Sequence, residues 1–562
     1  MESGHYTILG KVSRDFHHSV TFAIRANATR CTGSPLFRAR VMYPEIASMS
    51  KPSSSQPPRF RSFFVLALLL AAFLSIARAP NIPPPAEAPQ PQRVPGTGIT
   101  IQNQPSQAPQ QPKTAPPPST PVQQESEPEK PITKVQAKEL FRSVDEILEF
   151  VSHDTGLPIK HKVKRKLITR NKVENYVEKR LKDDKDAQRL EHEQLVLKKF
   201  GMIPQDYDLH TEFVKLLGEQ VAAYYDSKTK TVNLLDWVQP ELQRPVLAHE
   251  LTHALQDQSV DLQVWSQAGA PDSKPLPDQQ EQVVEEAQAA RQNVTEGQAM
   301  LAMLDYILAP TNQTVLTAPD AVDAMRAGMT SGQDSPVLAA APTFLRESLM
   351  MPYTFGFDFE RAVLTKKGTA TAYLGVLQRP PADTLQVMDP ETYLENKVAS
   401  PPTIPDLDKL IAPDYQRYDF GGMGAFDVYL LVRQYAPQDD AKSYYSHWRG
   451  GYYLAAHLKA APKDQIALLY FSRWDSQDAA KDFAKLYSAY APSRYKTARL
   501  DTSRASVEGD ENGNITYRWD FGSQGKVLIE VHGDDLLILE GFNDDTANRF
   551  STALIPAVQA TN

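Results

Sequence analysis

The pattern of apolar and polar residues predicts a hairpin followed by two long helices near the middle of the chain. Residues 220–235 read as strand, turn and strand, because aromatic, β-branched and other apolar residues flank a short polar run. Between 246 and 255, apolar residues recur with helical spacing, after Pro240 and Pro245, which suit a helix start. A second helix is expected over 278–308, which is rich in Ala, Gln and Glu and becomes apolar toward its end.

The other segments whose composition allows folding are expected to form further helices and strands, so that the protein belongs to the α+β class. We predict an N-terminal α+β lobe at 135–205, a central domain at 206–400 and a C-terminal α+β region at 401–562. Loops at 267–278 and 310–342 are expected to cover the cleft of the central domain. The other predicted elements are a short helix near 135, a strand at 163–168, charged helices including 171–181, a strand at 467–471, a helix at 477–487, and strands at 514–521 and 527–541.

One pentapeptide in the first of the two central helices carries a specific chemistry. In the sequence His249-Glu250-Leu251-Thr252-His253, two imidazoles lie one helical turn apart on one face, so both can reach one zinc ion. Glu250 then points at the open side of the metal, where a general base is needed. In the competing interpretation the histidines are hydrogen-bonded residues of the core or the surface. The preceding hairpin argues against it, since a sheet edge there would bind an extended peptide.

A catalytic zinc ion usually has three protein ligands and one water, so a third ligand must come from elsewhere. The residues after His253 do not continue to a third histidine, which excludes the HExxHxxGxxH class. Glu296 in the second helix is preferred, because Gly297 follows it at a cost of about 1 kcal/mol relative to Ala, which a close approach of two helices at the metal would offset. Glu285 is the alternative candidate for the third ligand. It lies on the same face of the helix as Glu296, about 16 Å away along the helix axis. Glu286 faces elsewhere, and all these glutamates have an alternative reading as solvated helix residues.

These residues resemble the gluzincin group of zinc metallopeptidases, especially its secreted bacterial members. The resemblance covers roughly residues 205 to 310 and rests on the segments HELTHALQDQ (249–258), Tyr224-Tyr225-Asp226 and Thr295-Glu296-Gly297. It implies a thermolysin-like arrangement on a zincin-like core, with Zn²⁺ held by His249, His253 and Glu296 and with Glu250 as the catalytic base. The chain departs from thermolysin four residues after Glu296, where an aspartate is replaced by Met300. Asp257 is a candidate substitute for that aspartate, which orients a histidine ligand.

The resemblance also implies a mechanism of amide hydrolysis. Zinc activates a water molecule, and Glu250 takes its proton and returns it to the leaving amine. A further donor to the oxyanion is expected from the downstream part of the chain. The candidates are Tyr353, Tyr393, His447, Arg449, Tyr452 and Tyr453, each of which also reads as a packing residue. A second class of function stays open, that of a noncatalytic envelope protein that keeps a zincin fold for binding, although an intact Glu250 favours hydrolysis.

The first eighty residues read as an export signal. Residues 63–76 are apolar, follow two arginines and precede Ala77-Arg78-Ala79, so cleavage is expected after Ala79. A start at Met49 would give this signal an ordinary length, which makes residues 1–48 an over-extended gene start. With a start at Met1, residues 63–76 become a membrane anchor instead. Either reading predicts a secreted, envelope or periplasmic location.

The amino-acid composition of the chain indicates which kinds of binding partner to expect. Residues 80–132 are dominated by Pro, Gln, Ala, Ser and Thr, which predicts a disordered linker. The single cysteine, Cys31, precedes the signal, so the predicted mature chain has no disulfide. A formal net charge of -8 disfavours nucleic acid, and the basic segment 160–172 reads as a solvated strand edge and helix start. The expected partner is a protein or peptide substrate, with cell-wall peptide included, and membrane contact only through residues 63–76.

Overall fold

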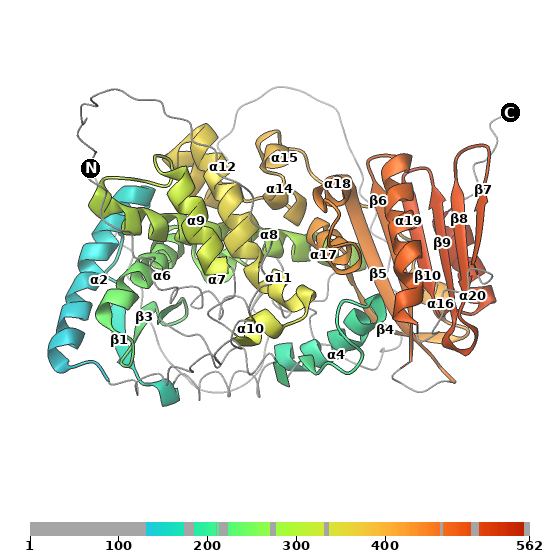
Figure 1. Cartoon of the computed structure of the whole chain (residues 1–562), viewed down its shortest axis with the longest axis horizontal. Coiled ribbons are helices and arrows are strands. Elements are labelled where there is room, and N and C mark those ends of the chain that lie inside the picture. Colours follow the sequence, from blue (N-terminus) through green and yellow to red (C-terminus); the bar gives the residue numbers. More distant parts are fainter. Residues whose placement is uncertain are drawn as a thin grey trace, which may run out of the picture. The chain divides into compact units, whose positions relative to one another are not determined.

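The computed structural model describes residues 131–172, 185–209, 211–212, 223–269, 277–330, 336–460, 465–495 and 505–555, all of which belong to one compact unit. They form a mixture of helices and strands, which confirms the α+β class (Figure 1). The predicted signal segment 63–76, the cleavage site and Cys31 lie outside the described residues, as does nearly all of the predicted linker. None of the helices in the described part of the chain combines the length and the apolar character needed to cross a membrane.

A small sheet and one long helix form the N-terminal part of this unit. Helix α2 (Lys134–Thr155) is longer than the short helix expected there, and strand β1 (Lys164–Ile168) is close to the predicted one. Strands β2 (Ala223–Asp226) and β3 (Thr231–Leu235) form the predicted hairpin. The strand order is β1-β3-β2, so β2 lies at an edge of the sheet, and β1 runs parallel to β3 at the other edge. The charged helix that precedes the hairpin is α4 (Lys185–Phe200).

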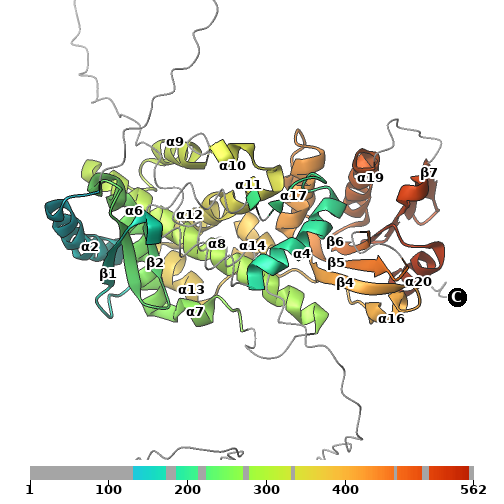
Figure 2. The same ribbon diagram turned by 90° about the horizontal axis from the view of Figure 1, so that it is seen from below.

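Two long helices pack against each other beside the small sheet. Helix α6 (Pro240–Val260) contacts α2, β2 and α8 (Asp278–Leu308), whose bounds are those predicted (Figure 2). Pro240 occupies the start of α6 as expected, but Pro245 lies inside the helix rather than before it. The buried side chain of Gln243 ties α6 to the end of β3, because its amide bonds both the N–H of Leu235, at 3.1 Å, and the carbonyl of Leu235, at 2.9 Å. The helix is thereby fixed to the hairpin that precedes it.

The segment expected to be a loop at 310–342 contains helices. Two of them are α9 (Pro319–Thr330) and α10 (Pro336–Ala340). The short helix α7 (Leu262–Trp265) ends just before the other predicted loop, 267–278. The other short helices and turns between α8 and β5 are η2 (Ala309–Thr311), which precedes α9, and then α11 (Thr343–Met351), the π-helical turn η3 (Pro352–Gly356), α12 (Phe357–Lys367), the π-helical turn η4 (Thr371–Gly375), α13 (Val376–Gln378), α14 (Thr384–Met388), α15 (Pro390–Leu394), α16 (Leu407–Ile411), α17 (Ala425–Tyr435) and α18 (Lys442–Tyr445).

A seven-stranded antiparallel sheet makes up the C-terminal part, which is larger than the small unit expected. Its order is β4-β5-β6-β10-β9-β8-β7, with the strands β4 (Tyr415–Gly422), β5 (Trp448–Leu458), β6 (Ile466–Trp474), β7 (Ala505–Gly509), β8 (Ile515–Asp520), β9 (Lys526–His532) and β10 (Asp535–Glu540). Neither β4 nor β5 was predicted. Alternate residues face opposite sides, so that Tyr453 packs in the main core and Tyr452 in a second core with α16 and α20 (Asp544–Leu554), while α19 (Gln477–Arg494) packs on the sheet.

Helix α8 joins the two parts of this unit. At its start the carboxylate of Asp278 accepts two hydrogen bonds from the guanidinium of Arg417 in β4, at 2.9 and 2.8 Å. Its middle packs on α6 and η3. One rigid helix therefore runs from the large sheet to the histidines of α6.

Candidate metal centre

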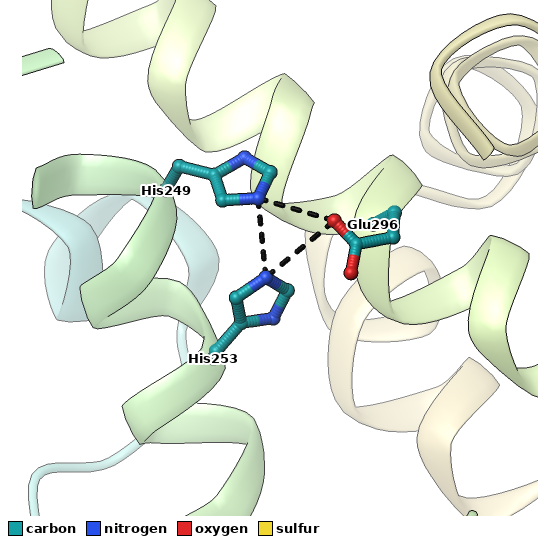
Figure 3. A group of neighbouring side chains, drawn as sticks. All are labelled: His249, His253 and Glu296. Atoms are coloured by element: carbon teal, nitrogen blue, oxygen red, sulfur yellow. Dashed lines mark hydrogen bonds and ion pairs between the residues drawn. The ribbon is translucent and has the colours of Figure 1, made fainter. Parts of the chain in front are cut away.

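The structure brings the three predicted metal ligands together between α6 and α8 (Figure 3). The Nε2 atoms of His249 and His253 lie 3.1 Å apart, and Oε2 of Glu296 lies 3.1 Å from the first and 3.6 Å from the second. The exposed fractions of the three residues are 2 %, 7 % and 0 % in the same order. Two imidazoles and a carboxylate that converge in a buried position form a group that could bind a metal ion.

A glutamine of α6 orients one of the imidazoles. Oε1 of Gln256 accepts a hydrogen bond from Nδ1 of His253 at 2.9 Å, and this assignment leaves Nε2 of His253 with its lone pair toward the other ligands. The amide nitrogen of Gln256 donates to the carbonyl of Thr295 at 3.0 Å and to the side chain of Gln298 at 2.9 Å. Gln256 thus links the second histidine to the part of α8 that carries Glu296.

The edge strand holds the predicted base. The backbone N–H of Tyr225 in β2 donates to Oε2 of Glu250 at 2.6 Å, and Oε1 of Glu250 has no protein partner among the described residues. Burial raises the pKa of this carboxyl group, although the two neighbouring imidazoles and the Tyr225 amide oppose the effect. One oxygen of Glu250 is therefore fixed by the backbone, while the other makes no hydrogen bond to the described residues.

Glu296 and His253 shift each other's pKa. Burial alone would raise the pKa of Glu296, but the two imidazoles lower it to about 2. Burial alone would lower the pKa of His253, but Glu296 raises it to about 9. Oε1 of Glu296 is buried without a hydrogen-bond partner among the described residues, and a metal ion would supply one. The donor set and this unpaired oxygen both fit a divalent ion.

A close contact of backbones sets the position of Glu296. A Cβ atom on Gly297 would lie 2.2 Å from the carbonyl oxygen of Gly356 in η3, and one on Gly356 would lie 2.4 Å from the carbonyl oxygen of Asn293. The prediction that Gly297 allows a close approach next to Glu296 is confirmed. The partner is the turn η3, and not α6 as an approach of the two long helices would require.

The other acidic residues considered from the sequence have different contacts. Glu285 lies at the far end of the buried part of α8, where its carboxylate accepts from the N–H of Gly422 at 3.4 Å. Glu286 accepts from the N–H and the hydroxyl of Thr384. Asp257 accepts from the hydroxyl of Tyr225 at 2.6 Å and from Nζ of Lys230 at 2.8 Å. Asp257 therefore fastens the hairpin to α6 and does not orient a ligand, a role that Gln256 has instead.

Among the six candidates for the oxyanion donor, the structure brings only Tyr353 to the ligands. Tyr353 is buried in η3, its hydroxyl has no hydrogen bond of good geometry among the described residues, and burial together with the carboxylates of Glu296 and Glu250 raises its pKa well above the ordinary value. The hydroxyl groups of Tyr393 and Tyr453 are bonded to the carbonyl of Arg379 and the carboxylate of Asp419, Tyr452 lies in the second core, and His447 and Arg449 both pair with Asp475.

Two contributions to the site were not predicted. Gln256 lies three residues after His253 on the same helix, a spacing at which side chains meet, so the sequence held a signal for it. The amide of Tyr225 is a backbone group, and no residue type could have indicated its role. Comparisons with protein-family models, with curated proteins and with solved structures gave no match. What the fold and the site define is a class, an α+β protein with a buried group of two histidines and one glutamate that could bind a metal ion.

Proposed function

We propose that this chain is a secreted zinc metallopeptidase that hydrolyses peptide bonds. The observation that carries the proposal is the convergence of two histidines, one glutamate and a separate buried glutamate, Glu250, whose Oε1 has no protein partner among the described residues. The hairpin β2-β3, α6 and α8 are the parts that a zincin-like core uses. The gluzincin resemblance stated from the sequence is consistent with them.

Zinc is the metal that the donor set and its surroundings favour. A set of two histidines and one carboxylate also occurs in iron oxygenases, so the ligands alone do not decide the metal. A carboxyl group with raised pKa beside the ligands suits hydrolysis, because a raised pKa makes its carboxylate a stronger proton acceptor. When bound, zinc supplies a Lewis acid that polarises a carbonyl group and acidifies water.

The side chains around the ligands would then have distinct roles. The Tyr225 amide holds one oxygen of Glu250, so that the other oxygen takes a proton from the attacking water and passes it to the leaving amine. The Tyr353 hydroxyl, which keeps its proton, donates to the oxygen that becomes negative. Gln256 keeps His253 in the tautomer that binds metal.

This chemistry implies that the substrate is a protein or a peptide, with cell-wall peptide included. It does not imply that a nucleic acid is a substrate. Export by the segment 63–76 would put the enzyme outside the cytoplasm, and an uncleaved segment would anchor it to the membrane. The second candidate function is a noncatalytic envelope protein with the same fold. The unpaired oxygen of Glu250 favours the enzyme, because a binding protein has no use for a base at that position.

The test separates metal binding from catalysis. We expect the purified protein to contain near-stoichiometric zinc and to hydrolyse an unstructured protein such as casein. Glu250→Gln should abolish hydrolysis and retain zinc, and Glu296→Gln should lose both. Glu285→Gln is the matched control on α8 and should change neither. Zinc with no hydrolysis in the parent would leave the noncatalytic candidate, and a folded parent that binds no zinc would refute both readings of the site.

A further inference from the structure

A second glutamine extends the hydrogen-bond chain that begins at His253. Nδ1 of His253 lies 2.9 Å from Oε1 of Gln256, and Nε2 of Gln256 donates to Oε1 of Gln298 in α8 at 2.9 Å. Nε2 of Gln298 in turn donates to the backbone carbonyls of Ala372, at 2.8 Å, and of Tyr373, at 3.1 Å. The chain of hydrogen bonds therefore runs from a metal ligand on α6, across α8, to the π-helical turn η4.

This chain is closed off from water. Gln256, Gln298 and Ala372 have no exposed surface, and Tyr373 is 2 % exposed. A buried amide group cannot exchange a lost protein partner for water, so each hydrogen bond in the chain restricts the orientation of the next group.

The two carbonyls of η4 give the chain a direction. A glutamine amide accepts at its oxygen and donates at its nitrogen, whereas a carbonyl oxygen can only accept. The nitrogen of Gln298 must therefore face η4, and its oxygen faces Gln256. That oxygen and the carbonyl of Thr295, at 3.0 Å, accept both hydrogens of the Gln256 amide. The end of Gln256 that remains for His253 is the oxygen.

This direction suits coordination by the opposite nitrogen of the ring. A His253 imidazole that donates from Nδ1 has a lone pair at Nε2 when it is neutral. Nε2 of His253 is the atom that lies 3.1 Å from Nε2 of His249 and 3.6 Å from Oε2 of Glu296 (Figure 3). A reversed Gln256 amide would place its own N–H groups against the N–H of the ring, which would disfavour this arrangement.

The backbone supports the same arrangement from three elements. His253 and Gln256 are three residues apart on α6, and Thr295 and Gln298 are three residues apart on α8, so each pair shares a helix face. Each carbonyl oxygen of η4 has two lone pairs and can accept from a side chain as well as from the backbone. Turn η4 packs against α12 and α13, so the anchor of the chain belongs to the folded core.

We propose that Gln298 is a positioning residue of the metal centre. Anchored on η4, it holds the amide of Gln256 with the oxygen toward His253, and so orients the imidazole before the metal ion arrives. This inference rests on the metal-binding part of the proposed function and not on the reaction. It requires that Gln298 act on metal affinity through Gln256.

The experiment is a double-mutant cycle on zinc affinity, measured by chelator competition with the full chain. Gln298→Met, which keeps the length of the side chain, and Gln298→Ala are each made alone and together with Gln256→Ala. Gln288→Ala is the matched control, because Gln288 is also a buried glutamine of α8, but its amide donates to the carbonyl of Gln267 at 3.2 Å. Thermal unfolding identifies a variant that misfolds, in which case the other Gln298 variant gives the answer.

The cycle distinguishes positioning through Gln256 from an independent structural role. Gln298→Met should weaken zinc binding about tenfold, and Gln256→Ala about 10- to 100-fold. The double variant should bind zinc within about twofold of Gln256→Ala alone, because the second change has nothing left to act through. Losses that multiply would overturn the proposal, as would wild-type affinity in a folded Gln298 variant or an equal loss in Gln288→Ala.

A spectroscopic signature tests the orientation of the ligand itself. The visible absorption of the Co²⁺-substituted protein reports the coordination geometry of the ion. Gln298→Met and Gln256→Ala should change this spectrum in the same way, whereas Gln288→Ala should leave it as in the wild type. An unchanged spectrum in folded Gln298→Met would count against the proposal.

Hydrolysis of casein by the same samples separates this inference from the proposed reaction. If zinc binds and the two losses are coupled but casein is not hydrolysed, the role of Gln298 stands and the reaction fails. If casein is hydrolysed and the losses multiply, the reaction stands and the role of Gln298 fails. A folded parent that binds no zinc refutes both.

Discussion

Replacement of Gly297 by alanine tests whether the backbone contact between α8 and η3 holds the third ligand. Alanine is favoured over glycine in a helix by about 1 kcal/mol, so at an unhindered position the change would stabilise the protein. At Gly297 the new Cβ would lie 2.2 Å from the carbonyl oxygen and 2.5 Å from the carbonyl carbon of Gly356. Both atoms belong to the backbone and cannot turn away as a side chain could.

The magnitude follows from the distance that must be recovered. Non-bonded carbon and oxygen atoms need about 1 Å more than this contact leaves, so α8 and η3 must separate by about that amount. Overpacking of this kind costs about 1–3 kcal/mol and exceeds the gain in helix propensity. We expect Gly297→Ala to lower the free energy of unfolding by about 2 kcal/mol. Because Glu296 is the adjacent residue, zinc affinity should fall by about tenfold or more.

The assay is urea unfolding of the metal-free and zinc-loaded protein, with the zinc affinity measured by competition with a chelator. Gly328→Ala is the matched control, since Gly328 lies in helix α9 and a Cβ there would meet nothing within 4 Å. The control should be more stable than the wild type by up to about 1 kcal/mol and bind zinc equally. If the two alanine variants behave alike, the close contact does not exist in solution and the account of Gly297 is wrong.

Three further predictions concern buried polar groups. Burial, aided by the carboxylate of Asp305, raises the pKa of Asp154 to about 7. Between about pH 4 and pH 7 the folded protein therefore keeps a proton on Asp154 that the unfolded chain has released. As the pH rises through this range, the free energy of unfolding falls by up to about 4 kcal/mol. Asp154→Asn should therefore be more stable than the wild type in urea at pH 8 and equal to it at pH 4, and an equal difference at both values would contradict the shift. Gln256→Ala should weaken zinc binding about 10- to 100-fold in chelator competition, and unchanged affinity would exclude the proposed orientation of the imidazole. Tyr353→Phe should lower kcat about 10²- to 10³-fold with zinc content retained, whereas Tyr393→Phe, whose hydroxyl bonds a distant carbonyl, should not.

The central elements could be predicted because their signals are local. The hairpin has a polar turn between two apolar strands, and α8 is a continuous run of helix formers, so its bounds were predicted correctly. The two histidines needed only the helical spacing of one turn. The glycine after Glu296 was informative because it is costly in a helix and therefore marks a place where something else approaches.

The large sheet and the surroundings of the ligands depend on contacts that are distant in sequence. Strand β5 combines glycines with aromatic residues and is buried on both faces, so it lacks the alternation that marks a half-exposed strand. The region 310–342 is interrupted by prolines and reads as a loop, although Pro319 and Pro336 each stand at the first position of a helix. Tyr353 could not be chosen from six candidates, because packing of η3 on α8 decides which aromatic side chain reaches the ligands.

Tyr225 ties the hairpin to the helix of the histidines by two hydrogen bonds. Its N–H points away from β3 and holds Glu250, and in an antiparallel strand the carbonyl of the same residue points to the same side. Its hydroxyl donates a hydrogen bond to Asp257, which lies two turns after Glu250 on α6. Strand β2 is therefore bound to the helix at two positions along the helix axis. An extended peptide added at this edge would therefore be aligned by the same residue that orients the base. Substrate alignment and proton transfer would then share one rigid support, and a shift of β2 should impair both together.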